Sequence, residues 1–66
     1  MRVRLFRSRF SSEILCAVPF DEDPPEFLAE AGWRMIGSRP ADRFSALTLP
    51  DNQRALGTIG HVIFPL

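Results

Sequence analysis

Alternating apolar and polar residues predict two strands at the start of the chain. Residues 2–7 place two aliphatic side chains on one face and Arg2, Arg4 and Phe6 on the other, as the two-residue repeat of a strand requires. Residues 13–20 are apolar on both faces, which indicates a strand that is covered on both sides. The short polar connection between these segments favours an antiparallel hairpin.

Start and stop signals predict two short helices. The first begins after Asp23, a suitable N-cap, with prolines in its first turn and Glu26 three residues after the cap, and it ends at Gly32. The second runs from Pro50 to about Ile59. Both are too short to be stable without packing against other elements.

Three further segments complete the predicted fold. Residues 33–38 indicate a third strand, and residues 44–49 indicate a fourth strand or an extended segment. Residues 61–64 form a closing strand, which Pro65 places at the edge of the sheet. We therefore expect a single small α+β domain over residues 1–66. Its mostly antiparallel sheet and two short helices follow the order β-β-α-β-(β)-α-β.

The length of the chain makes its stability marginal. A domain of 66 residues buries only about 60% of the surface that its unfolded chain exposes, so its stability is marginal unless a disulfide, a metal or a partner adds to it. One cysteine cannot form an intrachain disulfide, and one histidine with one cysteine is too few for a structural zinc site. We expect no metal and no cofactor, so self-association is the remaining route. A net charge of zero favours it.

The charges are segregated along the chain. All eight basic residues are arginines, and four of them lie in the first nine residues, whereas four of the eight acidic residues lie near the predicted start of the first helix. A charged strand face is often only a solvated surface, and acidic residues suit the first turn of a helix. The candidate interaction surface consists of Arg2, Arg4, Phe6, Arg7 and Arg9 on the basic side and Asp21, Glu22, Asp23 and Glu26 on the acidic side.

The inventory of catalytic residues is nearly empty, so we do not expect an enzyme or a small-molecule substrate. The glycines are scattered and form no phosphate-binding loop, and His61 is the only histidine. Cys16 lies in an apolar stretch and is expected to be a buried thiol, and Trp33 is expected to be a core residue. No apolar run reaches the length of a membrane span, and the cytoplasm is the expected compartment.

Three kinds of function remain. The leading hypothesis is a non-enzymatic protein-interaction module that associates with itself or with an unknown protein. In a two-fold dimer the basic strand of one copy would face the acidic helix start of the other, with Phe6, Phe10 or Phe27 as an apolar anchor. The alternative is a single-stranded nucleic-acid-binding accessory protein that uses the N-terminal arginines and Phe6, although a net charge of zero is unusual for that class. A small subunit of a larger assembly is a third possibility.

Several short motifs resemble a family of small uncharacterised proteobacterial proteins, a domain of unknown function. The resemblance covers the whole chain except residues 44–49, and it implies a small bacterial cytosolic protein without assigning a catalytic residue. The similar positions are Met1-Arg2-Val3, Leu5-Phe6-Arg7, Ala17-Val18-Pro19, Trp33, Asp51, Arg54 and Gly60.

Overall fold

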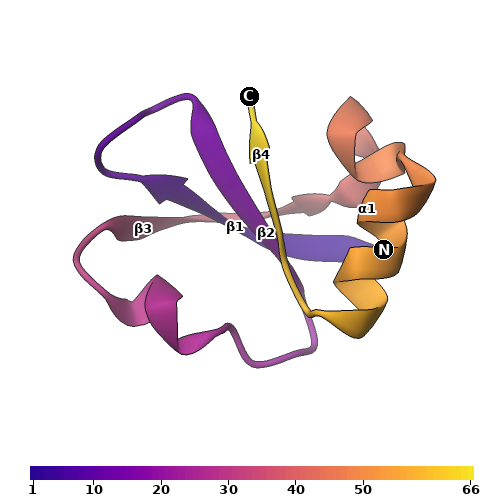
Figure 1. The fold of residues 1–66 in the computed structure, drawn as a ribbon, viewed down its shortest axis with the longest axis horizontal. Coiled ribbons are helices and arrows are strands. Elements are labelled where there is room, and N and C mark those ends of the chain that lie inside the picture. Colours follow the sequence, from indigo (N-terminus) through magenta and orange to yellow (C-terminus); the bar gives the residue numbers. More distant parts are fainter.

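The computed structural model describes residues 1–66 and contains one four-stranded antiparallel sheet (Figure 1). The strand order across the sheet is β3-β1-β2-β4, so the first two strands are central and the last two are at the edges. The strands are β1 (Arg2–Ser8), β2 (Ile14–Pro19), β3 (Trp33–Pro40) and β4 (Val62–Pro65). The other elements are the helix α1 (Pro50–Thr58) and three 3-10 turns, η1 (Glu26–Ala29), η2 (Ala41–Arg43) and η3 (Ser45–Thr48).

The predicted α+β class, the antiparallel hairpin and the edge position of the last strand are confirmed. The second predicted helix is confirmed as α1, with Pro50 at its first position. No helix of the structure is both long and apolar enough to cross a membrane. The predicted order of elements is wrong at two places, both of which are replaced by 3-10 turns.

The first predicted helix is a single 3-10 turn, η1. Pro24 precedes another proline, and this disfavours helical backbone angles at Pro24. Pro25 then takes an extended conformation (φ −56°, ψ 150°), and no side chain caps the turn that follows it. The helical segment therefore begins only at Glu26 and ends after four residues. The capping signal at Asp23 was present in the sequence, but the second proline overrides it.

Residues 44–49 form no strand, so the predicted fourth strand is wrong. The segment instead contains η3, in which the Leu47 N–H donates to the Phe44 carbonyl at 3.0 Å. Residues three apart in a 3-10 turn lie on the same side. This spacing directs Leu47 into the core and Phe44 onto the ring of Phe64, 5.6 Å between centroids.

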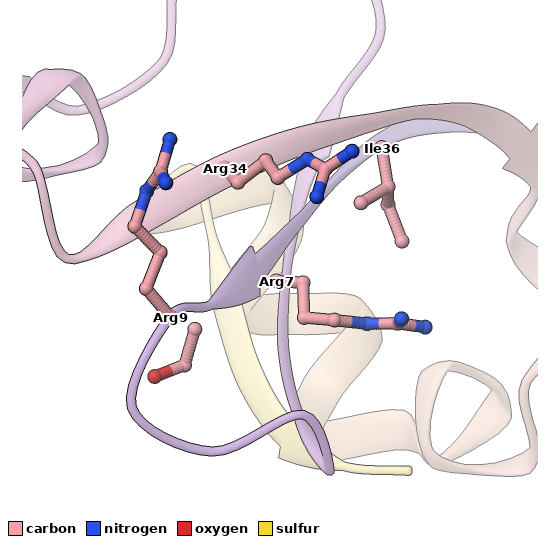
Figure 2. Close-up of a pocket in the computed structure, with 5 residues that line it drawn as sticks. Arg7, Arg9, Arg34 and Ile36 are labelled. Atoms are coloured by element: carbon pink, nitrogen blue, oxygen red, sulfur yellow. The ribbon is translucent and has the colours of Figure 1, made fainter.

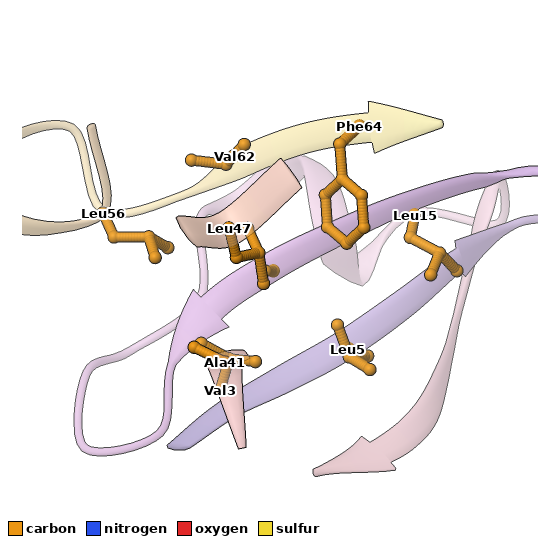
Figure 3. Close-up of a cluster of buried hydrophobic side chains, with 9 residues drawn as sticks. Val3, Leu5, Leu15, Ala41, Leu47, Leu56, Val62 and Phe64 are labelled. Atoms are coloured by element: carbon orange, nitrogen blue, oxygen red, sulfur yellow. The ribbon is translucent and has the colours of Figure 1, made fainter. Parts of the chain in front are cut away.

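Hydrophobic side chains pack on both faces of the sheet. The main core lies between the sheet and the segments η2, η3 and α1 (Figure 3). It contains Val3, Leu5, Leu15, Ala17, Ala41, Leu47, Leu56, Val62 and Phe64. A smaller core lies on the opposite face beneath η1 and contains Phe6, Cys16, Val18 and Leu28. In Figure 1 the turn η1 (magenta) and the helix α1 (orange) accordingly lie on separate sides of the sheet.

The predicted faces of the first two strands are confirmed. Val3 and Leu5 lie in the main core, whereas Phe6 lies in the smaller one. Residues 15–19 of β2 are all buried, as expected for a strand that is covered on both sides. The register of β1 against β3 shifts after Leu5, where Gly37 takes a φ of +131° that L side chains rarely adopt.

Candidate functional site

The arginines of the N-terminal strand are divided between two surfaces. Arg2 and Arg4 lie on the face of β1 that carries the smaller core, near the start of the strand. Arg7 lies near the other end of β1 and, like Val3 and Leu5, on the opposite face. Five residues of extended chain span about 17 Å, so Arg2 and Arg7 do not form one ribbon.

The first surface joins both signs of charge around one aromatic ring. The guanidinium carbon of Arg4 lies 5.3 Å from the centroid of the Phe20 ring. The Phe20 N–H donates to the Arg2 carbonyl at 3.1 Å, so the exposed acidic turn that follows Phe20 begins beside the basic strand. We call this the mixed-charge surface, and it consists of Arg2, Arg4, Phe20, Asp21, Glu22 and Asp23.

The arginine side chains of the mixed-charge surface are not bound to its carboxylates. Arg2 donates through Nη2 to the Ser38 Oγ at 3.0 Å. Arg4 is held over Phe20 by a cation–π contact. Each guanidinium carries five N–H donors, so most donors of both groups remain available to an outside acceptor.

An apolar hollow lies on the same face of the sheet. It has a volume of about 300 Å³ and is lined by Phe6, Pro24, Pro25, Glu26, Leu28 and Ala29. Phe6 is only 7% exposed and contributes the floor of the hollow as a core residue. Glu26, the last member of the predicted acidic group, is exposed and reaches this hollow rather than the turn that contains Asp21.

The second surface is a cavity of about 370 Å³ at the opposite end of β1 (Figure 2). Three arginines line it, and we call it the arginine cavity: Arg7, Ser8, Arg9, Arg34 and Ile36. Arg34 was not among the predicted site residues. It lies directly opposite Arg7 in the pairing of β1 with β3. No local pattern indicates this proximity, because β2 and η1 separate the two residues along the chain.

The polar groups of the arginine cavity are only partly satisfied. Arg9 donates through Nε to the Trp33 carbonyl at 3.5 Å, a weak bond. The Nε of Arg7 is buried and has no hydrogen-bond partner. The Ser8 Oγ accepts hydrogen bonds from the backbone N–H groups of Phe10 (3.1 Å) and Ser11 (3.3 Å), which leaves its own O–H free to donate.

The remaining residues with potential chemistry pack in the smaller core. Cys16 is fully buried, and desolvation raises the pKa of its thiol from 9.0 to about 11, which makes it a poor nucleophile. Phe27 contacts both Trp33 (6.0 Å between ring centroids) and His61 (5.1 Å) in edge-to-face geometry. Trp33 and His61 are thus half-buried packing residues.

Comparison with known proteins found no match to a family model, to a curated protein or to a solved structure. The resemblance to small proteobacterial proteins therefore stays a prediction. The two charged surfaces are the features of the molecule that bear on its function.

Proposed function

We propose that this protein is a small non-enzymatic interaction module that associates with a second copy of itself through the mixed-charge surface. The observation that carries the proposal is the position of the acidic turn, which begins at Phe20, beside Arg2 and Arg4. Charges that are separated along the chain therefore lie side by side, with the acidic turn next to the basic start of β1.

A patch of this kind is complementary to itself under a two-fold rotation. In an isologous interface a residue i contacts a residue j of the partner, and j contacts i in return. The basic half of one copy then faces the acidic half of the other, twice. Such charge complementarity fixes the register of the two copies and suppresses unrelated partners.

Apolar contacts supply the other part of the interface. Phe20 is 48% exposed and contacts Arg4, so it offers an apolar ring beside the charged groups of the surface. The hollow above Phe6 offers a place for an apolar side chain of the partner on the same face. Of the three anchors expected from the sequence, Phe6 and Phe27 are packed in the smaller core and Phe10 lies at the other end of β1. Phe20 therefore takes this role.

Association also addresses the marginal stability of a short chain, because a partner that binds only the folded state stabilises it by mass action. The buried, unpaired thiol of Cys16 supports a reducing compartment such as the cytoplasm.

A charge-swap experiment tests the proposal. The variants Arg2→Glu/Arg4→Glu and Asp21→Arg/Asp23→Arg each place like charges against each other in a homodimer, so each should be monomeric in analytical ultracentrifugation at low salt. Mixed in equal amounts, they should form a heterodimer. The introduced glutamates then face the introduced arginines, and the unchanged halves still face each other.

The matched control is Arg43→Glu/Arg54→Glu, which changes the net charge as much as the first variant does but at exposed arginines of η2 and α1. This control should dimerise like the unmodified protein. If each of the two charge-swap variants forms a dimer on its own, or if their mixture forms no heterodimer, the proposed interface is wrong.

A further inference from the structure

We propose that the arginine cavity is a binding site for a phosphate group, and specifically for the dianionic terminal phosphate of a phosphomonoester. The site lies at the far end of β1 from the mixed-charge surface, and its argument does not depend on self-association.

The first observation is the direct opposition of Arg7 and Arg34. Their backbones are paired partners on adjacent antiparallel strands, which brings their Cβ atoms to about 5 Å. Figure 2 shows the side chains of Arg7 and Arg34 extending in the same direction from β1 and β3, whereas the side chain of Arg9, the residue after β1, extends to the other side. Like charges in this position repel each other and destabilise the sheet unless an anion lies between them.

The second observation is that nothing in the cavity neutralises these charges. The lining contains three guanidinium groups, a serine and an isoleucine, and no carboxylate. The buried Nε of Arg7 has no acceptor. A buried donor without a partner destabilises the folded state, and a bound oxyanion would satisfy this donor while relieving the repulsion.

The third observation is that the backbone around Ser8 and Arg9 is held in place before any ligand arrives. The Arg9 N–H donates to the Gly32 carbonyl at 2.8 Å, which ties the end of β1 to the segment before β3. The Ser8 Oγ accepts two backbone hydrogen bonds and thereby orders the turn. Groups that are already ordered lose little conformational entropy when they bind.

The composition of the site selects the ligand. Guanidinium groups bind both carboxylates and phosphates in a bidentate manner. Three of them and a free hydroxyl donor match the three terminal oxygens and double charge of a phosphomonoester better than the two oxygens and single charge of a carboxylate. The cavity, about 370 Å³, is larger than a phosphate group, so it can admit a phosphate that belongs to a larger molecule.

The test is an NMR titration of the isotope-labelled protein with inorganic phosphate at pH 7.5 and constant ionic strength, with potassium chloride as the reference salt. We expect saturable shifts in the Nε–Hε signals of Arg7, Arg9 and Arg34, with those of Arg43 and Arg54 unchanged. Unsaturated shifts of similar size at all arginines, or equal shifts with chloride, would overturn the proposal.

Two variants separate the site from general charge effects. Arg34 is exposed, so Arg34→Gln should fold normally and weaken phosphate binding by about tenfold or more. Arg43→Gln, which removes the same charge from η2, should bind phosphate as the unmodified protein does. Equal affinities for the two variants would contradict the assignment.

Competition with short oligonucleotides tests whether the cavity binds a terminal phosphate or the phosphodiester backbone of nucleic acid. We expect an oligonucleotide with a 5′-phosphate to displace inorganic phosphate, and the same oligonucleotide with a 5′-hydroxyl to displace it at least tenfold less well. Equal competition by both would overturn the preference for a terminal phosphate and assign the cavity to the phosphodiester backbone of nucleic acid.

Discussion

Truncation of Phe6 to alanine should mainly destabilise the fold, whereas truncation of Phe20 to alanine should mainly weaken association. Phe6 is 7% exposed and is part of the smaller core, whereas Phe20 is 48% exposed and contacts Arg4 on the mixed-charge surface. The same chemical change thus removes a core side chain in one variant and an interface side chain in the other.

The expected magnitudes follow from burial. Removal of a buried phenylalanine costs about 3–5 kcal/mol. The whole chain of 66 residues has a free energy of unfolding of about 3–10 kcal/mol at typical values per residue. Phe6→Ala should therefore be largely unfolded, or should unfold at least roughly 10 °C below the unmodified protein.

Phe20→Ala should cost far less. About half of its ring is already exposed to water, so its truncation loses about 1 kcal/mol of burial and about 0.5 kcal/mol of cation–π energy with Arg4. The folded protein should persist, and its dimer should weaken.

The assay is urea unfolding followed by circular dichroism and by the fluorescence of the single tryptophan, Trp33. It is carried out at high salt and low protein concentration so that dissociation does not contribute. Sedimentation at low salt then measures association. A stability loss below about 1 kcal/mol for Phe6→Ala would refute the burial argument, and unchanged association of Phe20→Ala would refute its role as anchor.

Two further predictions concern the interior of the fold. Gly37→Ala should lower the free energy of unfolding by about 1–3 kcal/mol, because the φ of Gly37 is +131°. Gly57→Ala in α1 meets no neighbour and should raise the free energy of unfolding by about 0.5–1 kcal/mol. If urea unfolding shows no effect of Gly37→Ala, the bulge geometry is contradicted. For Cys16, the folded pKa of about 11 lies above the ordinary 9.0, so the unfolded chain loses the thiol proton first. Stability should be intact below pH 9 and fall between pH 9 and 11, and Cys16→Ala should lack this fall. Thermal melts can measure this loss of stability, and thiolate absorbance can measure the ionisation of Cys16. The chain has no lysine or tyrosine that would titrate in the same pH range.

The faces of the central strands could be predicted because burial is encoded locally. The alternation in β1 and the continuous apolar run in β2 specify which side chains contact the core, whatever the rest of the chain does. The same alternation also assigns Arg7 to the face of Val3 and Leu5, so the division of the arginines was present in the pattern.

The two errors in secondary structure arose where local signals compete. At Pro24 and Pro25 a capping residue and a first-turn proline favour a helix, but a proline disfavours helical angles in the residue before it, and Pro25 itself is extended. Between Phe44 and Leu47 the apolar residues suited a strand as well as a turn. Packing against Phe64, distant in the sequence, decided between them.

The candidate sites depend on contacts that no local pattern contains. Arg34 meets Arg7 only through the register of β1 with β3. The contact of Arg4 with Phe20 requires β1 and β2 to pair so that residues 4 and 18 are opposite. The acidic residues could be recognised as a cluster in the sequence. Their position beside Arg2 and Arg4 depends on the pairing of β1 with β2, which brings the end of β2 next to the start of β1.

The most direct measurement is the solution mass by light scattering after size exclusion, at low salt and at about 0.5 M sodium chloride. The screening length falls from about 10 Å at 0.1 M to about 3 Å at 1 M salt, so a charge-paired interface must weaken. We predict a dimer of twice the 7.5 kDa chain mass at low salt and a shift toward monomer at high salt. A monomer at low salt and high protein concentration, or a dimer that salt does not affect, would contradict self-association through the mixed-charge surface.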